Sequence, residues 1–295
     1  MSYIAVGNEN KYNLELHFTD RGAGEPVVLI HGYPFSGVAL ERQEEALIAA
    51  GYRVITYDRR GFGESSKPFV GYDYDTFASD LHTIIETLDL QNVSLIGHSM
   101  GTGEIARYIG KYGTSNIVRA VMLSPIPPFL LKTPDNESGV DQKVFDGIKE
   151  AIKKDRYAYM TDFLKNFYNL GMLSNSGVSE EKLRADFNLG AQAGNAAFLK
   201  CVDTWLTDFR PDVAKIDIPL LVIQGDADKI LPIQATGEVL TKEVGELCVI
   251  SGGSHGIPWT HYEDVNSAIL SFFEKGREVP VHREPFSGIE SSFQH

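Results

Sequence analysis

Residues 93–103 read VSLIGHSMGTG, a mainly apolar run that passes directly into a Gly-x-Ser-x-Gly motif centred on Ser99. The run at 93–97 predicts a strand buried on both faces, and residues 102–112 predict a helix. A sharp strand-to-helix turn needs small residues on both sides of its central residue, and it pushes that side chain clear of the backbone. The pattern therefore predicts a nucleophilic Ser99 hydroxyl at the start of a helix. The alternative is a glycine-rich turn in which Ser99 only caps the helix.

Two later loops supply the groups that a serine nucleophile needs. A serine hydroxyl reacts poorly until a base takes its proton. Asp226 and Asp228 follow an apolar run at 220–224, and His255 follows another at 247–250. The order Ser, Asp, His is expected when all three loops lie at one edge of a parallel sheet. We predict that His255 is the general base and that an aspartate orients it, with Asp228 preferred and Asp226 in reserve.

The loop after the first buried strand offers donors for the negative oxygen of a tetrahedral intermediate. Gly32-Tyr33-Pro34 follows the apolar run at 27–31. The backbone N–H of Tyr33 can join that of Met100 in an oxyanion hole, where each donor contributes on the order of 3 kcal/mol to the transition state. A tight strand-to-helix turn explains the same residues, and both interpretations can hold together. We expect the side chain of His31 to be structural.

Short apolar runs alternate with amphipathic segments, which is typical of a parallel sheet with helices on both faces. The predicted strands are residues 14–19, 27–31, 53–57, 93–97, 118–123, 220–224 and 247–250. The predicted helices in this pattern are residues 38–50, 75–90, 102–112 and 263–275.

Residues 126–211 interrupt that alternation with a proline-rich loop and a mainly helical, aromatic-rich segment. We interpret this segment as a lid over the carboxyl edge of the sheet. The domain plan is a core at residues 1–125, a lid at 126–211, a second part of the core at 212–275 and a flexible tail at 276–295. Lid residues Phe163, Phe167 and Trp205 are candidates for lining an apolar acyl pocket, although such aromatics more often belong to the core.

Composition restricts the partners of this chain. Its net charge of −13 argues against nucleic acid and against an anionic membrane surface, since both bind clustered Lys and Arg. A small, neutral substrate molecule is the partner least affected by that charge. Because the N-terminal residues lack a basic region followed by an apolar one, we expect a cytoplasmic protein. The sequence leaves the oligomeric state open, including a homo-oligomer.

Neither cysteines nor histidines form a recognisable metal or disulfide pattern. Cys201 and Cys248 are the two cysteines of the chain, and they predict buried free thiols rather than a disulfide framework. The eight histidines are dispersed, without a His-Glu-x-x-His pair. We predict no metal. The charged stretch Asp58-Arg59-Arg60 and the glycines after it are interpreted as a structural turn.

Seven stretches carry a family resemblance: VLIHGYP at 28–34, YDRRGFG at 57–63, GYDYDTFA at 71–78, SMGTGE at 99–104, DFLKNFYN at 162–169, DKILPI at 228–233 and HG at 255–256. Over residues 1 to about 275 the chain resembles the cofactor-free haloperoxidase group of α/β-hydrolases, which includes perhydrolases and aryl esterases. Within that group it is most similar to the bacterial (+)-γ-lactamases.

The resemblance implies a fold and a chemistry. The fold is the α/β-hydrolase fold, a mostly parallel eight-stranded sheet with helices on both faces and an inserted helical lid. The catalytic acid is Asp228, and the oxyanion donors are Tyr33 and Met100. The implied activity is acyl transfer without a cofactor, in which water or hydrogen peroxide attacks an acyl-enzyme formed from a small ester or amide. The peracid then oxidises halide in solution, and some relatives open a γ-lactam.

Two features depart from the family pattern. His98 stands before the nucleophile where phenylalanine is common, and we expect it to alter the acyl pocket. The segment between Asp228 and His255 is about two residues shorter than expected. Haloalkane dehalogenases and epoxide hydrolases share the fold but use an aspartate nucleophile, so Ser99 argues against both. A C–C hydrolase, a lactonase and a weakly catalytic receptor for a small ligand remain as alternatives.

Overall fold

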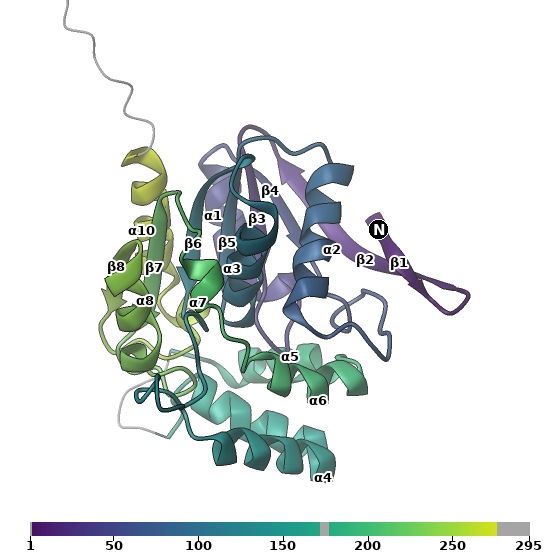
Figure 1. The fold of residues 1–295 in the computed structure, drawn as a ribbon, viewed down its shortest axis with the longest axis vertical. Coiled ribbons are helices and arrows are strands. Elements are labelled where there is room, and N and C mark those ends of the chain that lie inside the picture. Colours follow the sequence, from purple (N-terminus) through teal and green to yellow (C-terminus); the bar gives the residue numbers. More distant parts are fainter. Residues whose placement is uncertain (1, 172–176, 276–295) are drawn as a thin grey trace, which may run out of the picture.

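An eight-stranded sheet forms the centre of the molecule in a computed structural model that describes residues 2–171 and 177–275. The predicted tail at 276–295 lies outside these residues. The strand order is β1-β2-β4-β3-β5-β6-β7-β8 (Figure 1). The strands are β1 (Ser2–Glu9), β2 (Tyr12–Gly22), β3 (Pro26–Ile30), β4 (Arg53–Tyr57), β5 (Val93–His98), β6 (Ile117–Leu123), β7 (Leu220–Gly225) and β8 (Glu246–Ile250). Only the pairs of β2 with β1 and with β4 are antiparallel, so the mostly parallel, eight-stranded sheet is confirmed.

The edges of the sheet are where the sequence pattern was weakest. Strand β1 was absent from the strands expected from periodicity, because Ile4 is the one fully buried residue in it. Cys248 lies on the opposite edge strand, β8, and is partly exposed, so the expectation of two buried thiols holds for Cys201 alone. An edge strand has a neighbour on one side only, which leaves more of its side chains in contact with water.

Each face of the sheet carries its own apolar core, because successive side chains of a strand point to opposite faces. On β3, Val28 and Ile30 pack with helices α2 and α3, whereas Val27 and Leu29 pack with α1 and α10. The core helices are α1 (Glu41–Ala49), α2 (Tyr74–Thr87), α3 (Met100–Tyr112), α8 (Gly237–Glu243), α9 (Ile257–Thr260) and α10 (Tyr262–Lys275), with 3-10 turns η1 (Gly37–Leu40) and η2 (Ile233–Ala235).

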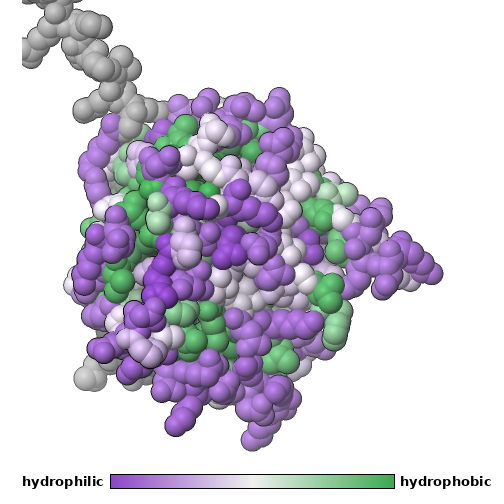
Figure 2. Space-filling model, viewed as in Figure 1, coloured by the Kyte–Doolittle hydropathy of each residue, from purple (hydrophilic) through white to green (hydrophobic). Residues whose placement is uncertain are grey.

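Four further helices come between β6 and β7: α4 (Gln142–Phe167), α5 (Glu180–Ala191), α6 (Asn195–Thr204) and α7 (Arg210–Val213). Figure 1 shows α4, α5 and α6 together at one end of the sheet. Figure 2 shows apolar surface between these helices and the sheet, on a face that is otherwise mainly hydrophilic. The limits of the lid at residues 126 and 211 stay a prediction.

The turn between β5 and α3 explains both glycines of the Gly-x-Ser-x-Gly motif. A Cβ atom on Gly101 would lie 2.3 Å from the carbonyl oxygen of Ile30, on the neighbouring strand. A Cβ atom on Gly97 would lie 2.7 Å from the carbonyl oxygen of Gly101. Between them Ser99 adopts φ 53° and ψ −118°, a conformation that costs a non-glycine residue about 1–3 kcal/mol. The helix therefore begins directly against the sheet, with Gly101 at the close approach and Ser99 in the turn just before it.

Two helical glycines provide a test of this close approach. Replacing Gly101 with Ala should lower the free energy of unfolding by about 1–3 kcal/mol, or prevent folding, because the new methyl group meets backbone. Gly147→Ala in α4 is the matched control, since a Cβ atom there meets nothing within 4 Å. That control should raise the free energy of unfolding by about 0.5–1 kcal/mol. Urea unfolding of both variants measures the difference, and equal effects would contradict the packing argument.

Candidate active site

Ser99 and His255 lie within proton-transfer distance of each other. The Ser99 Oγ is 2.9 Å from the His255 Nε2. Ser99 comes from the β5–α3 turn and His255 from the loop between β8 and α9, so the contact joins residues that are 156 apart in the chain. His255 is almost completely buried. The structure thus brings together the predicted nucleophile and the predicted base.

Asp228 faces the other ring nitrogen of His255. Its Oδ2 lies 2.7 Å from the His255 Nδ1, and its Oδ1 accepts hydrogen bonds of 2.9 Å from the backbone N–H groups of Ile230 and Leu231. These bonds orient the carboxylate toward the imidazole. A carboxylate accepts here, so the proton of neutral His255 sits on Nδ1 and the lone pair of Nε2 faces Ser99.

Asp226, the reserve candidate, has a different position. It is exposed, and its Oδ1 accepts a 2.7 Å hydrogen bond from the backbone N–H of Gly252. It therefore closes the turn that precedes the histidine loop instead of contacting the imidazole. The geometry therefore decides between the two aspartates, a choice that the sequence pattern left open.

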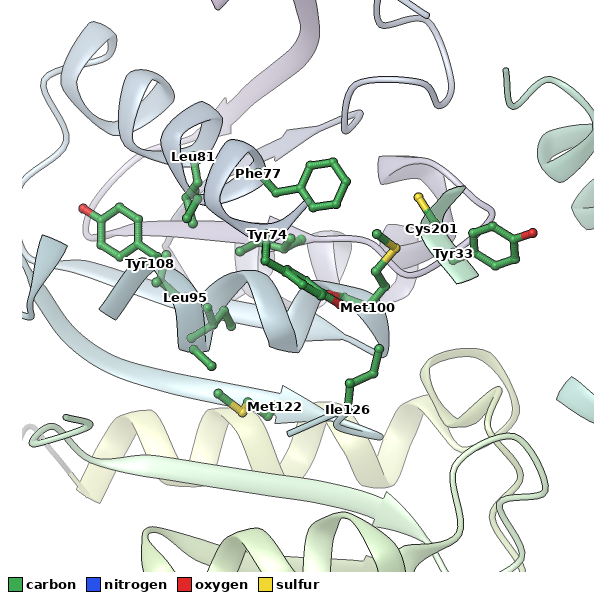
Figure 3. Close-up of a cluster of buried hydrophobic side chains, with 14 of the residues drawn as sticks. Tyr33, Tyr74, Phe77, Leu81, Leu95, Met100, Tyr108, Met122, Ile126 and Cys201 are labelled. Atoms are coloured by element: carbon green, nitrogen blue, oxygen red, sulfur yellow. The ribbon is translucent and has the colours of Figure 1, made fainter. Parts of the chain in front are cut away.

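The predicted oxyanion donors belong to Met100, which follows Ser99 in the chain, and to Tyr33, which lines the same cavity as Ser99. Met100 is the first residue of α3, where helical N–H groups have no intrahelical partner. Neither the Met100 N–H nor the Tyr33 N–H donates a hydrogen bond to another described residue. The side chain of Met100 is packed away in the core, and Figure 3 shows it in one cluster with Tyr74 and Phe77 of α2. The arrangement leaves two backbone donors beside the nucleophile.

A cavity of about 300 Å³ opens onto Ser99. Most of its lining side chains are apolar and come from the loop after β6, from α4 and from the loop after β7. They are Tyr33, Ser99, Ile126, Leu130, Val140, Val144, Phe145, Ile148, Tyr159, Asp162, Phe163, Asn166, Trp205, Lys229, Ile230 and Leu231. This volume is at the lower end of the range for small-ligand pockets.

The three lid aromatics predicted to line the pocket divide into two groups. Phe163 and Trp205 line the cavity, and the Trp205 ring lies 4.8 Å from that of Tyr33, edge to face. Phe167 does not line it, so that prediction is corrected. The Phe167 ring instead stands edge to face against His255, with 5.2 Å between centroids. Phe167 lies one helical turn beyond Phe163. It packs beside His255, whereas Phe163 lines the cavity.

The carboxyl end of α4 holds two of the catalytic loops, which the sequence did not indicate. The backbone oxygen of Phe167 accepts a 3.1 Å hydrogen bond from the N–H of Gly256. The Asn169 amide donates a 2.8 Å hydrogen bond to the backbone oxygen of Ala227. Asn169 has φ 53°, and an Asn just after a helix is a known signal for this conformation. That signal predicts a helix end but not its partner.

A buried ion pair secures the loop that carries Tyr33. The Arg59 Nε lies 2.8 Å from a Glu104 oxygen, and both side chains are almost fully buried. The guanidinium of Arg59 also donates to the backbone oxygen of His31 at 3.0 Å, and the Arg59 N–H donates to the His31 ring at 2.9 Å. Tyr57 donates its hydroxyl proton to Glu104. The charged stretch at 58–60 and His31 thus have the structural role that we expected.

Burial keeps the two histidines nearest the triad uncharged. Burial, reinforced by His255, lowers the pKa of His98 to about 3. Burial and the Arg59 cation lower the pKa of His31 well below its ordinary value. Neither ring adds a positive charge beside His255 at neutral pH.

Two searches of the described residues concern metal sites and membrane-spanning helices. No group of three or more His, Cys, Asp or Glu side chains there could hold a metal ion. No helix within residues 2–171 and 177–275 is both long enough and apolar enough to cross a membrane.

Several known proteins are similar to this chain in sequence and in fold. A family model described as the alpha/beta hydrolase fold matches residues 25–262. A Synechocystis protein provisionally named a non-heme chloroperoxidase is 52% identical over 276 residues, which cover 93% of this chain and 100% of that protein. The bifunctional esterase/perhydrolase of Acinetobacter calcoaceticus is 31% identical over 278 residues, covering 92% and 99%. A bromoperoxidase structure from Bacillus anthracis has 42% identity and a TM-score of 0.89, covering 92% and 99%.

The two aspartates give a paired test of the site. Asp228→Asn should lower kcat for a p-nitrophenyl ester by about 10⁴-fold, because an amide at this position stabilises the wrong imidazole tautomer. Asp226→Asn should change kcat less than about 3-fold, since its bond lies in a turn away from the ring. Steady-state kinetics of both variants decides the assignment. A larger loss in the Asp226 variant would reverse it.

The low pKa of His98 predicts acid sensitivity of the fold. The unfolded chain binds a proton at His98 below about pH 6.5, whereas the folded chain excludes that proton until about pH 3. The unfolded state therefore holds more protons in this window, and the free energy of unfolding falls as the pH is lowered through it. Urea unfolding between pH 7 and pH 4 should show a smaller pH dependence in His98→Gln. Equal slopes in the two proteins would contradict the assignment.

Proposed function

This chain belongs to the alpha/beta hydrolase fold family, and from that premise we propose that it is a serine hydrolase acting through an acyl-enzyme on Ser99. One observation carries the proposal. The hydroxyl, the imidazole and the carboxylate of Ser99, His255 and Asp228 form a continuous chain of 2.9 Å and 2.7 Å contacts, and Ser99 lines a largely apolar cavity.

Acylation would use each of these groups in turn. The His255 Nε2 takes the hydroxyl proton as the Ser99 Oγ attacks the carbonyl carbon of the substrate. The Asp228 carboxylate stabilises the imidazolium that forms. The N–H groups of Tyr33 and Met100 bind the negative oxygen of the tetrahedral intermediate. His255 then gives its proton to the leaving alcohol or amine as the bond to the acyl carbon breaks.

Deacylation would admit water or hydrogen peroxide. His255 removes a proton from the attacking molecule, which forms a bond to the acyl carbon, and the proton returns to the Ser99 oxygen as that oxygen leaves. Water yields a carboxylic acid and peroxide yields a peracid. The peracid and a proton then convert halide to hypohalous acid in solution, releasing the carboxylic acid. The names of the chloroperoxidase, bromoperoxidase and esterase/perhydrolase relatives support this sequence of steps, which needs no cofactor.

The cavity favours a small, uncharged acyl group as the substrate. Its volume of about 300 Å³ and its largely apolar lining suit short esters or amides, and a γ-lactam is the cyclic case that we propose to test. A C–C hydrolase, a lactonase and a weakly catalytic receptor are the alternative functions. A small-molecule partner and a cytoplasmic location stay predictions from the sequence.

Ser99→Ala tests the proposed chemistry. We expect rapid turnover of p-nitrophenyl acetate by the wild type and a loss of at least about 10³-fold in kcat in the variant, because the nucleophile is gone. Bromination dependent on acetate and peroxide should fall in parallel. Rates on a γ-lactam, a short aryl ester and acetate with peroxide then rank the activities.

Ser124→Ala is the matched control. Ser124 directly follows the neighbouring strand β6, has φ 47° and is fully buried, but its hydroxyl has no hydrogen-bond partner among the described residues and does not line the cavity. Its loss should leave ester turnover nearly unchanged. Full activity in Ser99→Ala would refute the serine mechanism. Slow turnover by the wild type, with tight retention of a ligand, would favour the receptor.

A further inference from the structure

His98 is buried directly beside the nucleophile but takes no part in the proposed chemistry. It is the last residue of β5, and only 2% of its surface is exposed. It does not line the cavity that opens onto Ser99, so the expectation that it alters the acyl pocket is wrong. Successive side chains of a strand point to opposite faces, which sends His98 away from the substrate.

The ring of His98 is bonded to the backbone of the catalytic histidine. Its Nε2 lies 3.0 Å from the carbonyl oxygen of His255. A carbonyl only accepts, so Nε2 carries the proton and the neutral ring leaves Nδ1 as an acceptor. The two imidazole centroids are 5.1 Å apart. The bond spans 157 residues of sequence.

This bond is one of two hydrogen bonds that restrain the same peptide group. The carbonyl oxygen of the peptide between His255 and Gly256 accepts from His98, and its N–H donates to the backbone oxygen of Phe167 at 3.1 Å. A peptide group is planar, so fixing both its oxygen and its hydrogen fixes its rotation. That restraint limits the backbone movement of His255, from which the imidazole projects.

The same ring also packs against the loop that carries Tyr33. A Cβ atom on Gly32 would lie 3.0 Å from the His98 Nδ1 and 3.1 Å from the Ser99 Cβ. His98 therefore contacts the base loop and the oxyanion loop while belonging to the nucleophile turn.

We propose that His98 is a positioning residue, which holds the His255 imidazole in line with Ser99 through its hydrogen bond to the His255 backbone. The inference rests on the proposed function, because it assigns a role within the same site. An uncharged donor suits this place, since a second cation 5.1 Å away would oppose formation of the His255 imidazolium.

Three substitutions separate the hydrogen bond from the volume of the ring. Gln places an amide nitrogen as many bonds from the backbone as the Nε2 of His, whereas Asn reaches only as far as Nδ1. Phe keeps a ring but has no donor. We expect His98→Phe and His98→Asn to lower kcat for p-nitrophenyl acetate by about 10- to 100-fold at a nearly unchanged KM, because small misplacements of a catalytic group carry losses of this size. His98→Gln should recover kcat to within about 3-fold of the wild type.

A spectroscopic readout makes the test independent of turnover. The proton between the His255 Nδ1 and Asp228 should give a downfield exchangeable signal in the ¹H NMR spectrum of the wild type and of His98→Gln. The signal should shift or broaden in the Phe and Asn variants. Urea unfolding identifies any variant that has lost its fold, and the Gln variant remains informative in that case.

The possible outcomes distinguish the two proposals. Full kcat and an unchanged signal in folded His98→Phe would overturn the role of His98. Equal losses in all three variants would overturn it as well, since they would indicate packing alone. A wild type without acyl-transfer activity would overturn the proposed function, and the proton signal would still decide whether His98 orients His255.

Discussion

The close approach of helix α3 to strand β3 is the constraint on which the rest of the structure depends. Gly101 lies so near the Ile30 backbone that a methyl group would be 2.3 Å from its carbonyl oxygen. Ser99 consequently sits at positive φ at the tip of a turn that cannot relax. Two kinds of group lie near this turn. They are the N–H groups at the start of the helix and the loops at the carboxyl ends of β7 and β8. The strain at Ser99 is the conformational cost of exposing its hydroxyl among them.

The loops around that turn are held mainly through their backbones. His98 and the carbonyl of Phe167 hold the histidine loop, Asn169 holds the aspartate loop, and the buried Arg59 holds the backbone at His31. None of these supporting groups is a side chain of the proposed catalytic triad. Because these bonds are buried or partly buried, water screens them little, and breaking a buried one would leave an unpaired polar group at a cost of about 1–3 kcal/mol. The site is therefore preorganised by polar contacts of residues that do not line the cavity.

Sequence patterns predicted the parts of this structure that have local causes. Buried runs such as 93–97 identified the central strands, and loops after strands identified Ser99 and His255, because position in a parallel sheet follows from the order of elements. Edge strand β1 was missed since it has too little buried surface to show a pattern. The choice of Asp228 came from a family resemblance, and geometry supplied its physical reason. The bonds of His98 and Asn169 had no local signature, because their partners lie 157 and 58 residues away.

Helix α4 links substrate selection to the geometry of the catalytic groups. Tyr159 and Phe163 on this helix line the cavity, and one turn later Phe167 contacts His255 and its loop. Asn169 then bonds to the aspartate loop. The continuous backbone hydrogen bonds of a helix hold its successive turns in fixed relation, so the wall of the cavity and the supports of the two catalytic loops belong to one element. The residues of α4 that line the cavity and those that support the His255 loop therefore occupy successive turns of the same helix, so the shape of the cavity and the position of that loop have a common structural origin.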